Sequence, residues 1–146
     1  MSASGSNRDY ARRALDVLAD EAPAHYAILV IELRRLSGRY RVGSETFAIL
    51  ARDGAVVVDD VAPAQAVLDV AIEAPDIVRL LDGTVMIEVL LRDERLRIVA
   101  DSDALLRLAN VVATVLDGAL HLRALQDLFD EYRAWVAAPK GIGPVV

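Results

Sequence analysis

Apolar residues recur at helical spacing near the beginning of the chain. Ser6 and Asp9 have the spacing of a capping box, in which a serine caps a helix and an acid follows three residues later. The apolar pattern continues to Pro23, and the residue before a proline is driven out of the helical region. A second stripe runs through 24–36 and ends before Gly38, a residue type that commonly terminates helices. β-branched residues in 24–36 also suit a strand. The stripe favours a helix, so two helices are predicted.

The apolar period changes to two in the middle of the chain, which is the spacing of half-buried strands. The pair Asp53-Gly54 is the strongest short signal of a β-hairpin turn in the sequence. It separates the second and third of five alternating segments, which are 39–42, 47–52, 55–59, 68–73 and 95–98. These segments predict five strands, with a loop over 61–66 between the third and the fourth.

Helical spacing returns after the fourth strand. Pro75 suits the first turn of a short helix that Gly83 stops, and Thr84 is expected to cap a second one. Gly118 is expected to separate two longer helices. The predicted helices are 76–81, 84–91, 103–117 and 120–137. The helix over 103–117 is apolar on most of its circumference, so it is either buried on two sides or faces a cavity or a partner.

This order of elements predicts one α+β domain over 1–146. Its mainly antiparallel five-stranded sheet is expected to be covered by helices on one face. The N-terminal helices occupy 7–37, the core occupies 39–137, and the segments 1–6 and 139–146 are expected to be flexible tails.

Composition excludes several classes of protein. The 146 residues are 55% hydrophobic and carry a formal net charge of −6, which argues against a nucleic-acid binder. The absence of cysteine excludes disulfides and thiol chemistry, and the two histidines lie too far apart for a local metal motif. No metal or other cofactor is expected. The apolar runs, such as Ala27 to Ile31, are far shorter than the ~18–20 residues of a membrane span. These features indicate a soluble cytoplasmic protein, and the preference for arginine over lysine indicates a bacterial one.

A succession of apolar patterns and glycines follows the strands and short helices. Its parts are Phe47-x-Ile49 before Asp53-Gly54, Val56-Val57-Val58, Leu68-x-Val70-x-Ile72, Ile77-x-x-Leu80-Leu81-Asp82-Gly83, Leu90-Leu91, Arg95-Leu96-Arg97-Ile98 and Asp101-x-x-Ala104-Leu105-Leu106-x-Leu108. With this succession, residues 47–108 resemble the sterol carrier protein type 2 family of lipid-binding domains, and the order of elements extends the resemblance to about residues 39–120. The chain departs from the family at Asp93 and Ala100, where the family often has glycine.

The resemblance implies an apolar cavity between the sheet and the helices that binds a lipophilic small molecule. The ligand would be fatty acyl, sterol-like or polyketide-like, bound or transferred without catalysis. Combined with the strand alternation and the helical stripes, it predicts a cavity lining of Phe47, Ile49, Val70, Ile72, Leu96 and Ile98 from the sheet, Ile77, Leu81, Met86, Val89 and Leu90 from the short helices, and Leu105, Leu108, Val112 and Leu116 from the long helix.

An enzyme, or an enzyme accessory, acting on an apolar acyl or polyketide substrate in the same cavity is the alternative. It would need polar groups that face the cavity. Glu88 is a candidate because burial would raise its pKa and make it an acid–base group; a polar face of a short helix explains it equally well. The other candidates, which surface positions or turns also explain, are Asn110, His121, Asp59 and Asp60.

Two contacts with partners are further possibilities. A basic cluster of Arg34, Arg35, Arg39 and Arg41, joined by Arg52, suits a lipid carboxylate, the phosphopantetheine phosphate of an acyl carrier or an anionic membrane, or is simply a solvated face. The aliphatic helix over 103–117 could instead close a homodimer, which would make the protein an interaction module. The last helix, with Phe129, Tyr132 and Trp135, could cover the cavity, contact a second copy or simply pack in the core.

Overall fold

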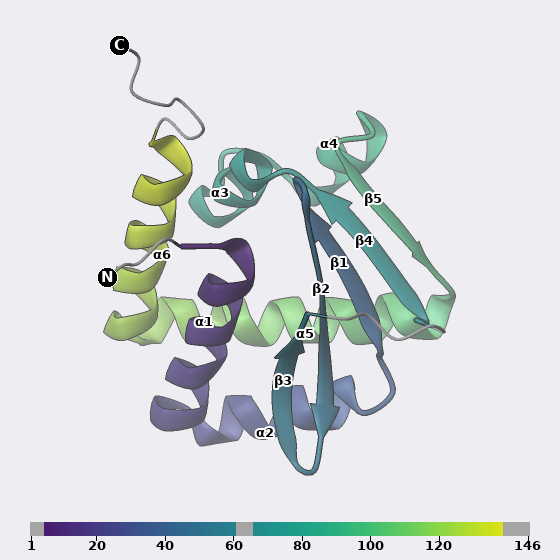
Figure 1. Ribbon diagram of the computed structural model, residues 1–146, viewed down its shortest axis with the longest axis vertical. Coiled ribbons are helices and arrows are strands. Elements are labelled where there is room, and N and C mark those ends of the chain that lie inside the picture. Colours follow the sequence, from purple (N-terminus) through teal and green to yellow (C-terminus); the bar gives the residue numbers. More distant parts are fainter. Residues whose placement is uncertain (1–4, 61–65, 139–146) are drawn as a thin grey trace.

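The computed structural model describes residues 5–60 and 66–138. Six helices and five strands follow one another along the described chain (Figure 1). They are α1 (Asn7–Glu21), α2 (Pro23–Leu33), β1 (Gly38–Val42), β2 (Glu45–Arg52), β3 (Ala55–Asp59), β4 (Leu68–Ile72), α3 (Ala74–Asp82), α4 (Ile87–Arg92), β5 (Leu96–Ala100), α5 (Ser102–His121) and α6 (Arg123–Ala137).

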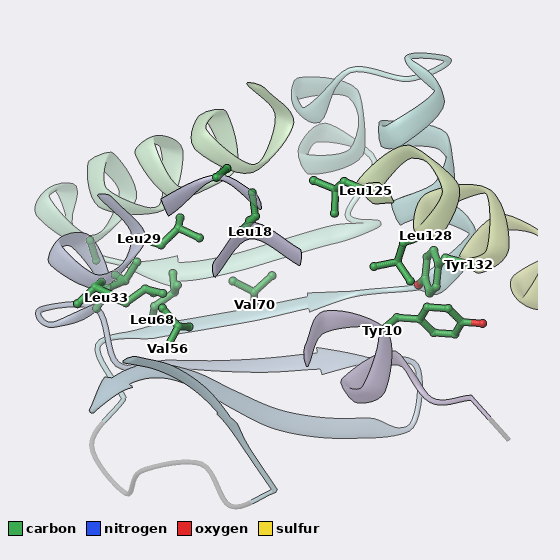
Figure 2. Packing of buried hydrophobic residues seen from close by; sticks show 14 of the residues in the cluster. Tyr10, Leu18, Leu29, Leu33, Val56, Leu68, Val70, Leu125, Leu128 and Tyr132 are labelled. Carbon is green, nitrogen blue, oxygen red and sulfur yellow. The ribbon is translucent and has the colours of Figure 1, made fainter. Parts of the chain in front are cut away.

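The strands form one sheet in the order β3-β2-β1-β4-β5. Neighbouring strands are antiparallel except for β1 and β4, which run parallel. In register, Tyr40 lies between Phe47 on β2 and Val70 on β4, so these side chains share one face of the sheet. Figure 2 shows the helices gathered over that face. The predicted α+β class with a mainly antiparallel five-stranded sheet is confirmed.

Several sequence signals act locally as predicted. The Ser6 hydroxyl accepts a hydrogen bond from the Asp9 amide at 3.1 Å and caps α1. Pro23 occupies the first turn of α2, directly after the end of α1. Asp53 and Gly54 have φ angles of 55° and 78°, the left-handed conformation that the central residues of a tight hairpin need.

Three local signals act differently from the prediction. Gly38 does not end a helix: α2 stops at Leu33 and Gly38 is the first residue of β1. Thr84 does not cap α4, because its hydroxyl donates to the carbonyl of Arg79 at the end of α3. Gly118 lies inside α5, which continues to His121. A side chain at position 118 would place its Cβ 2.9 Å from Leu18, so the glycine serves close packing of α5 on α1. The predicted loop over 61–66 and the predicted tails lie largely outside the described residues.

The main core lies where the helices cross the sheet. Leu18, Leu29 and Leu33 from the first two helices meet Leu68 and Val70 of β4 (Figure 2). The side chains of Leu18, Leu29 and Leu68 are completely buried, and complete burial of a leucine contributes roughly 1.5–3 kcal/mol. This end of the molecule is therefore filled.

Helix α5 is long and apolar enough to cross a membrane by length and composition. It is nevertheless bound to the rest of the domain along two sides. Arg107 and Asn110 contact Glu32 of α2 at 3.2 Å each, and Asp117 contacts His25 at 2.7 Å. On another side, Ala104 and Gly118 are buried against the core.

Candidate functional site

An apolar cavity of about 290 Å³ lies between the sheet and the helices, away from the filled leucine core, and opens to the surface. Its accessible wall is almost entirely apolar. The described lining residues are Asn7, Tyr10, Ala11 and Ala14 of α1, Tyr40 and Val42 of β1, Phe47 and Ile49 of β2, Ile72 of β4, Ile77 and Leu81 of α3, Val115 of α5, and Leu128, Phe129 and Tyr132 of α6.

Two alanines explain why space remains under α1. Ala11 and Ala14 lie on the side of the helix that faces the sheet, and both border the cavity. One turn further along, Leu18 occupies the equivalent place and is completely buried. The change from alanine to leucine along one face of α1 therefore converts a cavity into a packed core.

Tyr40 lies flat along its own strand because the neighbouring residue on that face is a glycine. A Cβ at Gly38 would be 2.8 Å from Tyr40 Cε1 and 2.9 Å from its hydroxyl, closer than Cβ atoms approach other groups. The ring stacks on Phe47 with centroids 6.2 Å apart and an interplanar angle of 22°. Burial raises the pKa of the Tyr40 phenol, which stays protonated at neutral pH.

A chain of hydrogen bonds lies at the aromatic end of the cavity. The Tyr132 hydroxyl donates to Asn7 Oδ1 at 2.6 Å, and Asn7 Nδ2 donates to Glu45 Oε2 at 2.5 Å. Glu45 also accepts from the backbone amide of Asn7 at 2.9 Å. This chain joins α6, the start of α1 and β2. Burial, followed by the charge of Glu45, raises the pKa of Tyr132.

Tyr10 faces Tyr132 across this end, with ring centroids 5.1 Å apart in an edge-on arrangement (Figure 2). Its hydroxyl donates to Glu131 at 3.4 Å. Burial and the Glu131 carboxylate raise the pKa of Tyr10. Arg13 holds Glu131 with two hydrogen bonds of 2.7 and 2.9 Å and lowers the pKa of that carboxyl. The polar groups of this end are therefore already paired with protein atoms.

The structure brings a third of the predicted lining residues together around the cavity. These five are Phe47, Ile49, Ile72, Ile77 and Leu81. The other ten lie elsewhere: Val70, Leu90 and Leu96 are buried in the core, Ile98 and Leu108 pack against it, Val89 and Val112 are half-buried, and Met86, Leu105 and Leu116 are exposed at 65%, 44% and 43%.

The placement of α4 and α5 explains why predicted lining residues on these helices lie away from the cavity. Helix α4 packs at the sheet edge beside β5, so Met86 before its first turn points to solvent. On α5, Val115 borders the cavity whereas Leu116 faces outward, which is the ~100° rotation between consecutive helical residues. The contributions of α1 and Tyr40 were missed, because no pattern in the sequence shows which helix covers which end of a sheet.

None of the candidate acid–base residues borders the cavity. Glu88 is exposed, and Asn110 donates to Glu32 at 3.2 Å. His121 contacts the backbone carbonyl of Asp117 at 2.9 Å at the exposed end of α5. The other two candidates pair with arginines: Asp59 with Arg52 at 2.9 Å, and Asp60 with Arg8. Among the described residues, no group of three or more histidine, aspartate or glutamate side chains could hold a metal ion.

Two of the five arginines of the predicted basic cluster are paired with carboxylates. Arg39 pairs with Asp69 on the neighbouring strand, and Arg52 pairs with Asp59. Arg39 lowers the pKa of Asp69 through this contact. Arg41 lies on the face of the sheet opposite the helices, and Arg34 directly follows α2. The contact with a membrane or an acyl carrier that this cluster suggested stays a prediction.

These features define a class of protein: an α+β domain whose sheet and helices enclose an apolar cavity. No protein-family model and no curated protein sequence matches the chain. Solved structures match it in three dimensions. A ubiquinone synthesis protein titled UbiJ-SCP2 has a TM-score of 0.58 at 17% identity, over 82% of this chain and 98% of that one. The sterol carrier protein domain 2 of Helicoverpa armigera has a TM-score of 0.58 at 14% identity, over 80% and 96%. The chain therefore has the sterol carrier protein 2 fold.

Proposed function

We propose that this protein binds and transfers a lipophilic small molecule, without catalysing its conversion. The observation that carries the proposal is the apolar cavity of about 290 Å³ under α1. An accessible apolar cavity is the usual form of a site for an apolar ligand. The similar structures support this interpretation, since one is titled a sterol carrier protein domain and the other a ubiquinone synthesis protein, and sterols and ubiquinone are both lipophilic.

The size of the cavity limits the ligand. A volume of about 290 Å³ lies near the lower end of ligand pockets, which span roughly 300–1,000 Å³. At roughly 30 Å³ per water-sized group it holds about ten such groups. Ten buried methylenes give about 8 kcal/mol of gross transfer free energy, against an association cost of about 4–15 kcal/mol. We therefore expect modest affinity and broad specificity for chains or ring systems of this size.

The alternative of catalysis in the same cavity has less support. The described wall carries three phenols and one amide but no carboxylate, imidazole or cationic side chain. Acid–base chemistry near neutral pH commonly relies on those missing groups. The nearest carboxylates, Glu45 and Glu131, are held in hydrogen bonds with Asn7 and Arg13.

The proposal predicts that a lipophilic molecule copurifies with the protein or can be loaded into it. Purified protein would be extracted with organic solvent and the extract analysed by mass spectrometry. In parallel, displacement of a neutral fluorescent lipophile would be measured for a panel of acyl chains, alcohols and terpenoids. We expect displacement by ligands of about ten carbons. An empty extract, together with no displacement by any member of the panel, would contradict the proposal.

A further inference from the structure

The hydroxyl of Tyr40 is a polar group on an apolar wall that no protein group satisfies. Tyr40 borders the cavity, and no hydrogen bond to its hydroxyl exists within the described chain. Desolvation alone accounts for the raised pKa of this phenol, so neither a charge nor a hydrogen bond contributes to it. A polar group without a protein partner needs one from water or from a ligand, because an unmade hydrogen bond costs roughly 1–3 kcal/mol once the group is buried.

The hydroxyl is not fully enclosed by protein. The Nε atoms of Arg8 and Arg39 are the side-chain polar atoms of the described chain that are both buried and without a hydrogen-bond partner. The Tyr40 hydroxyl is not among them, so part of its surface remains accessible. Tyr40 is half-buried and borders the cavity, which is the space from which a ligand could reach this surface.

The remaining polar groups of the wall are occupied. Tyr132 donates to Asn7, Asn7 donates to Glu45, and Tyr10 donates to Glu131. No arginine, lysine or histidine is present among the described lining residues. A carboxylate bound at Tyr40 would therefore be buried without a countercharge, which is strongly unfavourable. A neutral oxygen, by contrast, can both accept a hydrogen bond from a phenol and donate to it if it carries hydrogen.

We propose that Tyr40 is the hydrogen-bonding anchor of the cavity, and that it selects uncharged lipophiles with a carbonyl or hydroxyl oxygen over hydrocarbons and over fatty-acid anions. This inference rests on the proposed function and narrows it to one class of ligand. Gly38 is part of the site, since only its missing side chain lets the Tyr40 ring lie along β1.

Four ligands of equal chain length test the proposal: decane, 1-decanol, decan-2-one and decanoate, each displacing a neutral fluorescent lipophile at pH 8. We expect the alcohol and the ketone to bind more tightly than decane, and decanoate to bind most weakly. Replacement of Tyr40 by phenylalanine should weaken binding of the alcohol and the ketone about 3- to 10-fold, which corresponds to one neutral hydrogen bond, and should leave binding of decane unchanged.

Tyr26→Phe is the matched control. The Tyr26 hydroxyl accepts a hydrogen bond from the Val56 amide at 2.8 Å outside the cavity, so the ligand ranking should survive its loss. An unchanged ranking in Tyr40→Phe, or decanoate binding more tightly than decanol to the unaltered protein, would overturn the anchor while leaving the cavity function intact. Failure of all four ligands to bind the unaltered protein would overturn both.

A second inference comes from the outer face of α5 and does not depend on the cavity. This face is apolar and exposed: Leu106 is 68% exposed, Leu116 43% and Leu120 75%, and Ala109 and Ala113 are also exposed. The spacing follows the repeat of three and four residues with which helices pack lengthwise on one another. The other sides of α5 are bound to α2 and to the core.

The sequence of large and small residues on this face is the same in either direction along α5. Leu106, Ala109, Ala113 and Leu116 are separated by three, four and three residues, with the small residues inside and the large ones outside. A two-fold contact between identical surfaces requires such self-complementarity. In an antiparallel pair, Leu106 would meet Leu116 of the second copy and Ala109 would meet Ala113 of the second copy, with the alanines allowing close approach.

The charges near this face favour a second copy over a membrane. Helices that lie on membranes carry lysine and arginine beside the apolar face. Here Asp103 and Asp117 border the face, Arg107 is engaged by Glu32 and Asp103, and the protein has a formal net charge of −6. We infer that the protein forms a homodimer through antiparallel packing of α5 on α5 of the second copy.

The mass in solution, measured by size-exclusion chromatography with light scattering, tests the dimer. At 100 µM we expect a dimer for the unaltered protein and a monomer for Leu116→Glu. Leu91→Glu is the matched control, because Leu91 is 42% exposed but lies on α4 outside the face, and it should remain dimeric. A monomeric unaltered protein, whether or not it binds phosphatidylglycerol vesicles, would overturn the inference, as would a dimeric Leu116→Glu.

Cross-linking tests the register of the two helices. The chain has no cysteine, so each introduced thiol is unique. The Ala109→Cys and Ala113→Cys proteins would be mixed under mild oxidation. A disulfide needs Cβ atoms about 3.5–4.5 Å apart, and in the antiparallel register position 109 meets position 113 of the second copy. The disulfide between position 109 of one variant and position 113 of the other should therefore form in preference to a disulfide between two identical variants. Preference for a disulfide between two identical variants, or no disulfide at all, would overturn the antiparallel register.

Discussion

Replacement of both Ala11 and Ala14 by leucine is expected to abolish ligand binding while the fold is retained. Both alanines border the cavity on the sheet-facing side of α1. Six added carbon atoms, at roughly 30 Å³ each, fill more than half of the available 290 Å³. Loss of about half of the ligand's apolar burial removes several kcal/mol of transfer free energy, so affinity should fall at least 100-fold. Displacement of a neutral fluorescent lipophile measures the effect.

Ala19→Leu provides the matched control, since Ala19 lies on the same helix but is exposed. It should bind ligand as the unaltered protein does. Thermal unfolding separates blocking from misfolding: cavity filling commonly stabilises a domain by about 0.5–2 kcal/mol, whereas overpacking costs about 1–3 kcal/mol. Undiminished binding by a well-folded double variant would show that the ligand lies outside this cavity.

The strands and the faces to which their side chains point followed from the sequence because burial enforces them. A slip of one residue would turn every apolar strand residue to the wrong face, so the alternation at Phe47, Ile49, Val70 and Ile72 has a single acceptable arrangement. The hairpin at Asp53-Gly54 was equally determined, because few residue pairs accept two successive positive φ angles.

The cavity was less predictable because it depends on what is missing. Ala11 and Ala14 look like ordinary small core residues, and only their position opposite Tyr40 and Phe47 makes them the roof of a cavity. Gly38 has a backbone that any residue could adopt, so its role appears only when the Tyr40 ring is seen above it. The pattern of apolar residues indicates which side chains face inward, but not the distance between the surfaces that they form.

Gly118 illustrates a related failure. Glycine lowers helix stability by about 1 kcal/mol, which made a break at this position the reasonable prediction. In the structure, close contact of α5 with Leu18 of α1 outweighs that preference. Packing between residues far apart in the sequence cannot be predicted from the residues that surround Gly118 in the chain.

Asp76→Asn is expected to destabilise the protein by about 3 kcal/mol, near the lower end for removing one partner of a buried ion pair. Asp76 has no exposed surface and is the one buried charged residue in the described core. Arg79 Nη1 lies 2.9 Å from Asp76 Oδ1, and Arg95 Nε lies 3.1 Å from both carboxylate oxygens. Asparagine keeps the shape but removes the charge and points an amide donor at guanidinium donors. Both arginines are about half exposed and can turn to water, which limits the loss.

Urea unfolding measures this loss, and Asp103→Asn is its control. Asp103 pairs with Arg107 at 2.9 Å but its side chain is 70% exposed, so the same substitution should cost less than about 1 kcal/mol. Equal stabilities of the two variants would show that the buried carboxylate contributes no more than a surface pair.

The Asp76 ion pair also bears on the cavity, because it connects the start of α3 with Arg95, which directly precedes β5. Ile77 and Leu81, which border the cavity, follow Asp76 on the same helix. If the ion pair holds α3 in place, Asp76→Asn should weaken ligand binding under conditions in which the protein is still fully folded, whereas Asp103→Asn should not. Loss of stability without any change in affinity would instead show that the core alone fixes this wall of the cavity.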